Sequence, residues 1–179
     1  MILGVIGFTT IVIALHIVQN DYDPIHQLMS EMALGKHGSF MLIAFLSFSI
    51  SVFFNQSILV TYKNNLLARV LLIIASFSLV GAGLFKLGSY TELHISLVAL
   101  AFVLIVLSMY LIPRLILEFR YLVPIITCWG FGLITTVSVF LGQGFIPIGI
   151  AQRLATGFIL IWLLWLAIFH QKQTWRQNV

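Results

Sequence analysis

The sequence predicts an all-α membrane protein, a bundle of six transmembrane helices with a short amphipathic helix at the membrane surface after the first span. The first observation behind this prediction is composition. Hydrophobic residues make up 61% of the 179 residues and charged residues only 8%, whereas about a quarter of a typical soluble domain is charged. A soluble protein cannot bury that much apolar surface, so the composition indicates a lipid bilayer as the solvent.

The second observation is that the apolar residues fall into six continuous segments. A helix of about twenty residues crosses a hydrocarbon core of roughly 30 Å, and within lipid the backbone must satisfy its own hydrogen bonds, which favours helices. The short alternating segments of a β-barrel are missing from the sequence. Short connections predict antiparallel neighbours in one domain covering residues 1–179. The predicted spans are Ile2–Gln19, Phe40–Tyr62, Leu66–Phe85, Leu93–Ile112, Tyr121–Leu141 and Ile150–His170.

The first span starts at Met1 without a basic leader or a small-residue cleavage site. These features predict a retained helix rather than a removable signal peptide. Cys128 is the only cysteine, so the sequence indicates no disulfide framework.

The distribution of basic residues predicts the orientation, because Lys and Arg accumulate on the cytoplasmic side of a membrane. With six spans, one face carries six basic residues and one acid, Glu118, and the other face carries three basic residues and four acids. Both termini should therefore be cytoplasmic, in a multi-pass protein of the cell (inner) membrane, with residues 20–39 outside. The net charge of +4 is explained by this placement, so we expect the bilayer rather than nucleic acid as the partner. The six basic residues are Lys63, Arg69, Arg114, Arg120, Lys172 and Arg176.

The first outer segment predicts a helix over about 24–34. Asp23 followed by Pro24 is typical of a helix start, and Gly35 is typical of a helix end. Between them, four apolar residues recur at helical spacing and form one stripe. Such a helix would lie in the membrane interface or fold over the bundle. The stripe consists of Ile25, Leu28, Met29 and Met32.

Polar and ionisable residues gather at this predicted outer face and indicate a site there. Ionisable groups near the membrane are functional candidates by default, and four of the five histidines, including His16 and His37, belong to this face. Arg153, at the start of the last span, either reaches lipid headgroups or pairs with Glu31, Asp21 or Glu92. The candidate ligand-binding residues are His26, Ser30, Glu31, Lys86, Glu92, His94 and Arg153.

Three stretches resemble a known family. The run Pro24–Gly38, PIHQLMSEMALGKHG, is similar to the signature after the first span of the domain-of-unknown-function family 998. GLFKLG at 83–88 with His94, and Gln152-Arg153 before a Trp-containing last span, resemble later parts of that pattern. The departures are Met32 where a leucine is usual and Lys86 where a proline is usual. The resemblance implies a small six-helix prokaryotic membrane protein with His26, Ser30, Glu31 and His94 as signature residues, and it implies no activity.

Three functions remain open at this stage. The first is binding of a lipid or other amphiphile in an outer-face pocket, with Lys86 and Arg153 beside a phosphate headgroup. The second is a metal-dependent membrane hydrolase or a haem protein, although no local metal-binding motif is present. The third is an accessory subunit of a larger membrane complex or an oligomer.

The enzymatic alternative has candidate residues for a nucleophile, for haem ligation and for metal binding. Ser30 lies one helical turn from His26, which suggests a nucleophile and its base, and His16 with His94 is the candidate pair of haem ligands. Metal ligands would come from His26, His37, His94, Asp23, Glu31 and Glu92.

Overall fold

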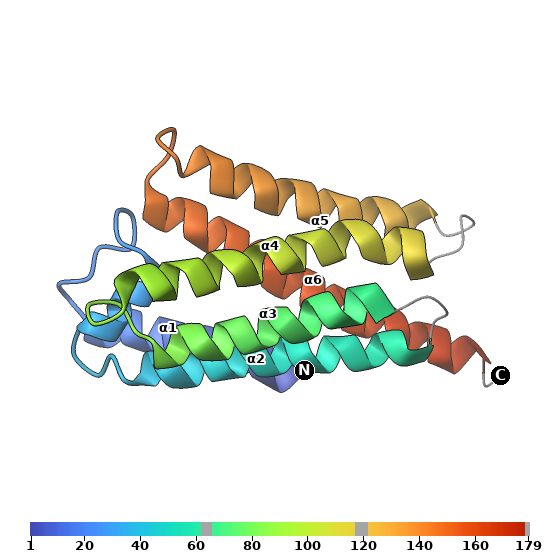
Figure 1. Cartoon of the computed structure of the whole chain (residues 1–179), viewed down its shortest axis with the longest axis horizontal. Coiled ribbons are helices and arrows are strands. Elements are labelled where there is room, and N and C mark those ends of the chain that lie inside the picture. The colour runs from blue at the N-terminus through green and yellow to red at the C-terminus, as the bar shows by residue number, and fades with distance from the viewer. Residues whose placement is uncertain (62–65, 117–121, 178–179) are drawn as a thin grey trace.

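The computed structural model describes residues 1–61, 66–116 and 122–177, and within these ranges all regular structure is helical (Figure 1). This agrees with the all-α part of the predicted fold class. The elements are α1 (Ile2–Val18), the 3-10 helix η1 (Met29–Leu34), α2 (Phe40–Ile58), the 3-10 helix η2 (Leu59–Thr61), α3 (Leu66–Leu84), α4 (Thr91–Ile116), α5 (Leu122–Leu141) and α6 (Ile148–Gln177).

Five of these helices, α2 to α6, are long and apolar enough to cross a membrane. The sixth predicted span is the apolar helix α1, which has 17 residues and measures about 26 Å at 1.5 Å per residue. The bounds differ most from the prediction at α4 and α6. Helix α4 continues through Pro113 to Ile116, although the residue before a proline is usually a helix end. Tyr62 and Tyr121, the predicted ends of two spans, lie outside the described residues.

Helices that follow one another in the chain pack side by side, and α6 completes the bundle by contacting α2 and α1. Figure 1 shows them running alternately in opposite directions along the long axis, as the short connections predict. Helix α5 contacts both α4 and α6. Helices α4, α5 and α6 surround a common space, which is the cavity described below.

Polar side chains inside the bundle bond across helices. Ser49 Oγ of α2 donates to the Ser76 carbonyl of α3 at 2.8 Å, and Arg69 Nε donates to Gln56 Oε1 at 3.1 Å. Trp162 of α6 is fully buried and its indole N–H lies 3.4 Å from Cys128 Sγ of α5. These bonds satisfy polar groups that have no water to turn to inside a bilayer.

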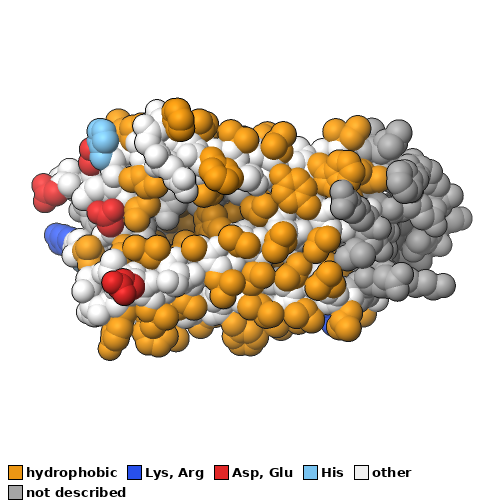
Figure 2. All heavy atoms as spheres, turned by 45° about the horizontal axis from the view of Figure 1, so that its top comes forward, with side chains coloured by type: hydrophobic (Ala, Val, Ile, Leu, Met, Phe, Trp, Pro, Cys, Tyr) orange, Lys and Arg blue, Asp and Glu red, His pale blue; other side chains and the backbone are white. Residues whose placement is uncertain are grey.

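Most of the charged side chains that the structure describes gather at one end of the bundle. This end carries the connection from α1 to α2 and the connections at 85–90 and 142–147. Figure 2 shows acids, histidine and a basic residue on it, whereas hydrophobic side chains are spread over the described part of the flank. The pattern is that of a protein whose flank faces lipid and whose end faces water. We call this the loop end.

Candidate functional site

The segment after α1 differs from the predicted helix over about 24–34. Residues 24–27 form turns, and the helix that follows is the short 3-10 helix η1, Met29–Leu34. The Asp23 carboxylate accepts a hydrogen bond from the Ile25 N–H at 2.8 Å, so it closes a turn instead of starting an α-helix. At the N-terminus of η1, the Leu28 N–H donates a hydrogen bond to Glu31 Oε1 at 2.9 Å. The helix ends at Gly35, as expected.

Two methionines of η1 face the protein. Met29 and Met32 are buried in the bundle core, and η1 contacts α1, α2 and α6. Gln19 of the preceding turn donates to the carbonyls of Met32 at 2.9 Å and Lys36 at 2.7 Å. Of the two predicted placements, these contacts agree with the one in which the segment folds over the bundle.

Arg153 of α6 holds the first part of the same segment. Its guanidinium donates to the Gln27 carbonyl at 3.2 Å, to His16 Nε2 at 3.2 Å and to the Tyr22 hydroxyl. It also lies 5.5 Å from the Tyr22 ring centroid, within the range of a cation–π contact. The predicted pairing of Arg153 with Glu31, Asp21 or Glu92 is wrong, since the ion pair among the described residues joins His26 to Asp23. Carbonyl, imidazole and phenol groups take the place of a carboxylate.

Tyr22 is the aromatic member of this cluster. Its hydroxyl donates to the Leu28 carbonyl at 2.9 Å, and its ring meets His16 edge-on with centroids 5.1 Å apart. Burial raises the pKa of the Tyr22 phenol above its ordinary value, while the hydrogen bond and charge of Arg153 act in the opposite direction. The phenol therefore stays protonated near neutral pH.

His94, in the first turn of α4, connects the loop end to the bundle interior. It is 2% exposed, and its Nδ1 lies 2.8 Å from the Ala82 carbonyl and 3.1 Å from the Phe85 carbonyl, at the end of α3. Carbonyls only accept, so Nδ1 donates to them, and in the uncharged imidazole the lone pair is at Nε2. That Nε2 is buried and has no hydrogen-bond partner.

A cavity of about 520 Å³ opens beside His94, between α4, α5 and α6. Its wall is almost entirely apolar, and several wall residues, including Val103 and Phe140, are exposed. The cavity is therefore open on the hydrophobic flank, where Figure 2 shows a hollow. Its lining includes Ser30, His94, Leu107, Thr136, Val139 and Gln152.

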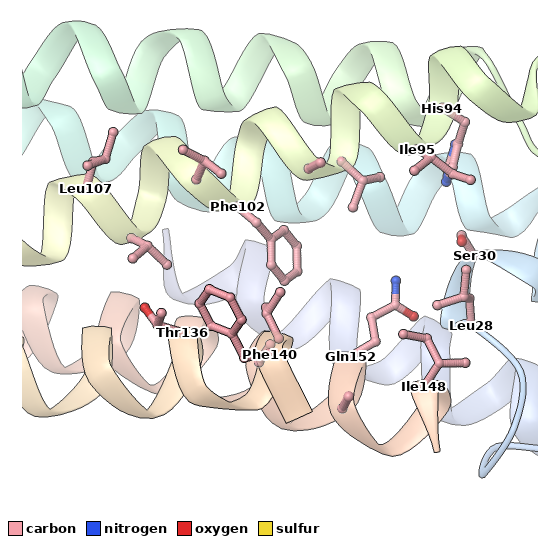
Figure 3. Close-up of a pocket in the computed structure, with 17 residues that line it drawn as sticks. Leu28, Ser30, His94, Ile95, Phe102, Leu107, Thr136, Phe140, Ile148 and Gln152 are labelled. Carbon is pink, nitrogen blue, oxygen red and sulfur yellow. The ribbon is translucent and has the colours of Figure 1, made fainter. Parts of the chain in front are cut away.

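The polar groups of the cavity lie at its loop end. His94, Ser30 and Gln152 come from α4, η1 and α6 and face the same space, whereas Leu107 and Thr136 lie at the opposite end (Figure 3). The Thr136 hydroxyl is occupied by the Gly132 carbonyl of its own helix at 2.8 Å. The cavity thus has one polar end and one apolar end.

Gln152 contributes a donor to the polar end. Its Oε1 accepts from the Met29 backbone N–H at 2.6 Å, and because a backbone N–H only donates, the other side-chain atom is the NH₂ group. Figure 3 shows this nitrogen pointing into the cavity. The Ser30 hydroxyl makes no hydrogen bond within the part of the chain that the structure describes, so it can serve as donor or acceptor.

The comparisons with known proteins decide the family. A family model described as "Protein of unknown function (DUF998)" matches residues 2–168. The chain belongs to the DUF998 family. No significant match was found among curated proteins or solved structures. The resemblance noted in the sequence is thereby confirmed.

The candidate residues of this DUF998 protein fall into two groups. Ser30 and His94 line the cavity, whereas His26, Lys86 and Glu92 are exposed and do not line it. Glu31 and Arg153 hold the loop by the hydrogen bonds described above. The role of all seven in binding stays a prediction. Sequence reasoning did not assign Gln152 to the site, and its position next to Arg153 at the start of α6 was the available signal.

The geometry also bears on the metal and haem alternatives. Among the described residues, no three His, Cys, Asp or Glu side chains lie close enough together to hold a metal ion. For haem, the lone pair of His16 Nε2 is already used by Arg153, because His16 Nδ1 must donate to the Val12 carbonyl at 2.8 Å. His26 is likewise bound to Asp23 at 2.7 Å and does not bond to Ser30.

Proposed function

We propose that this DUF998 protein binds an amphiphilic molecule in the cavity between α4, α5 and α6. The observation that carries the proposal is the asymmetry of the cavity, which has hydrogen-bonding groups at the loop end and an apolar wall everywhere else. Its volume of about 520 Å³ falls within the roughly 300–1,000 Å³ of pockets that bury one small ligand. A molecule with a polar head and an apolar chain matches both ends.

The opening of the cavity supports a ligand that comes from the membrane. It opens on the hydrophobic flank, so a chain dissolved in the bilayer reaches it without crossing water. We place the loop end outside the cell and both termini in the cytoplasm of a cell (inner) membrane protein, on the basis of the positive-inside rule. The polar head would then lie at the level of the outer leaflet headgroups.

Co-purification tests the proposal. The protein is purified in mild detergent, and native mass spectrometry with solvent extraction identifies any retained amphiphile. The variants Val139→Trp and Val137→Trp form a matched pair, because both valines are 45% exposed on α5 but only Val139 lines the cavity. Retention in wild type and Val137→Trp with loss in Val139→Trp supports the proposal. Equal retention in all three proteins contradicts it, because the bound molecules would then lie elsewhere on the hydrophobic surface.

A second candidate function is ester hydrolysis, favoured by Ser30 and His94 at the same end of one cavity. His94 has the tautomer of a general base, and the Gln152 NH₂ is a donor for an oxyanion. Ser30 Oγ would attack the ester carbonyl while His94 Nε2 takes its proton and returns it to the leaving alcohol, and water would then release the acid from Ser30 by the reverse proton transfers. A fluorophosphonate probe that labels wild type but not Ser30→Ala supports this function, and absence of labelling in wild type contradicts it.

A further inference from the structure

The two fixed polar groups of the cavity have opposite hydrogen-bonding character. His94 Nε2 offers only a lone pair, because the carbonyls of Ala82 and Phe85 hold the proton on Nδ1. Gln152 presents its N–H donors to the cavity, because the Met29 N–H binds its oxygen on the other side. A ligand head must therefore donate to one group and accept from the other. We infer that the ligand is an uncharged single-chain amphiphile whose head is a hydroxyl group, which does both.

Anionic heads do not match this arrangement. A carboxylate or a fully ionised phosphate only accepts, and it would face the lone pair of His94 without a donor there. A buried anion also needs a positive partner, and no Lys or Arg side chain lines the cavity in the described parts of the chain. Lys86 is exposed, and Arg153 is bound to the Gln27 carbonyl, His16 and Tyr22. These observations favour an uncharged head over the phosphate headgroup that the sequence led us to expect beside Lys86 and Arg153.

Cationic heads do not match either. A quaternary ammonium group neither donates to His94 nor accepts from Gln152, and no carboxylate of the described residues lines the cavity to balance its charge. A ligand that leaves the buried Nε2 of His94 without a hydrogen-bond donor binds more weakly, because an unsatisfied buried polar group raises the free energy of the complex. The hydroxyl of Ser30 can turn to support either hydrogen bond of the ligand head but cannot supply a charge.

The apolar part of the cavity sets the kind of chain. Leu107 lies 13 positions after His94 along the wall of α4, which is about 20 Å along a helix. This is the depth of one leaflet and somewhat more, since the full hydrocarbon core is roughly 30 Å. A cavity of this depth and of about 520 Å³ suits one extended chain better than the two chains of a phospholipid.

The inference rests on the proposed function, and binding of four probes tests it. Tritiated 1-hexadecanol is bound to the protein in nanodiscs, with Val139→Trp giving the background outside the cavity. Unlabelled 1-hexadecanol, its methyl ether, hexadecyl phosphate and hexadecyltrimethylammonium then compete. We expect the alcohol to compete about tenfold better than the ether, which lacks the donor to His94, as the loss of one hydrogen bond to a buried group predicts. The charged probes should compete more weakly still.

The variant His94→Asn assigns the preference to Nε2. Asparagine keeps a side-chain N–H close to the Nδ1 position, so the carbonyls of Ala82 and Phe85 retain a donor, but it removes the acceptor in the cavity. In this variant the alcohol and the ether should compete equally. If the variant does not fold, the comparison of alcohol and ether in the wild type still decides.

The outcomes separate the two proposals. Cavity-specific binding with equal competition by all four heads overturns the hydroxyl assignment and leaves amphiphile binding intact. Preferential competition by hexadecyl phosphate also overturns it, because it requires a cation in the site. No binding above the Val139→Trp background contradicts the proposed function itself.

Discussion

The backbone N–H of Met29 donates to the side-chain oxygen of Gln152, with 2.6 Å between the two atoms. This bond joins the first residue of η1 to the first turns of α6, 123 residues further along the chain. It also determines which end of the Gln152 amide faces the cavity. The loop that follows α1 and the polar end of the cavity are therefore one structural unit, and changes in the loop should affect both.

Gly149 of α6 is expected to be intolerant of a side chain. A Cβ at this position would lie 2.6 Å from each of the carbonyl oxygens of Pro24, Ile25 and Gln27, and backbone atoms cannot give way as a flexible side chain can. Gly149→Ala should lower the free energy of unfolding by about 1–3 kcal/mol, as overpacking does. Thermal unfolding in detergent measures the change.

The control for this variant is Gly157→Ala on the same helix. Nothing lies within 4 Å of a Cβ there, so the substitution should be neutral or stabilise the helix by up to about 1 kcal/mol through its better helix propensity. Equal unfolding temperatures for the two variants would show that the loop does not pack on α6.

Arg153→Ala should destabilise the loop end. It removes the donors to the Gln27 carbonyl, His16 and Tyr22, and hydrogen bonds that involve a charged group contribute about 1.5–3 kcal/mol each when measured singly. We expect a loss of about 2–3 kcal/mol because Arg153 is half-buried and water can partly replace it. Arg153→Lys should recover little, since an ammonium group cannot reproduce the planar fork.

The measurement for Arg153 is hydrogen exchange of the backbone together with thermal unfolding. Faster exchange in Arg153→Ala should be confined to residues 19–28 and the adjoining turns of α6. A variant with wild-type exchange and unfolding would show that Arg153 lies free at the membrane edge.

Asp23 should titrate below the ordinary range of an aspartate. Its hydrogen bond with His26 is the main cause of the lowered pKa, followed by the Ile25 N–H. Because the pKa is lower in the folded state, its contribution to stability is present above the unfolded pKa and is lost as the pH falls through the folded pKa. His26→Ala should move the Asp23 midpoint, followed by carboxyl-carbon NMR, back towards its ordinary value. An unchanged midpoint would contradict the pairing.

The transmembrane helices were predictable because hydrophobicity over about twenty residues is a property of the sequence itself. Consecutive helices such as α2 and α3 could be expected to be antiparallel because their connection is short. Details of the bounds were less predictable, as Pro113 within α4 shows. Trp162 is buried beside Cys128 in the core, and the sequence alone does not distinguish it from a tryptophan at the membrane interface.

The site was only partly predictable for the same physical reason. The spacing of Met29 and Met32 indicates an apolar face but not whether protein or lipid covers it. The partners of Arg153 are largely backbone and uncharged groups, which charge patterns do not reveal. Ser30 and His94 were candidates, but the cavity that brings them together is formed by ordinary apolar residues of three helices, and only the packing distinguishes these from residues that face lipid.

Mapping the position of a bound chain is the most direct test of whether an amphiphile binds in the cavity with its head near His94. Two photoreactive 1-hexadecanol probes, with a diazirine near the hydroxyl or near the end of the chain, are crosslinked in nanodiscs and the labelled residues are mapped by mass spectrometry. We expect the first probe to label residues near His94 and Ser30 and the second to label residues near Leu107 and Thr136. Val139→Trp should abolish both patterns. Labelling spread over exposed residues outside the cavity, such as Phe77 on α3 and Ile126 on α5, with no difference between the probes, would contradict this expectation.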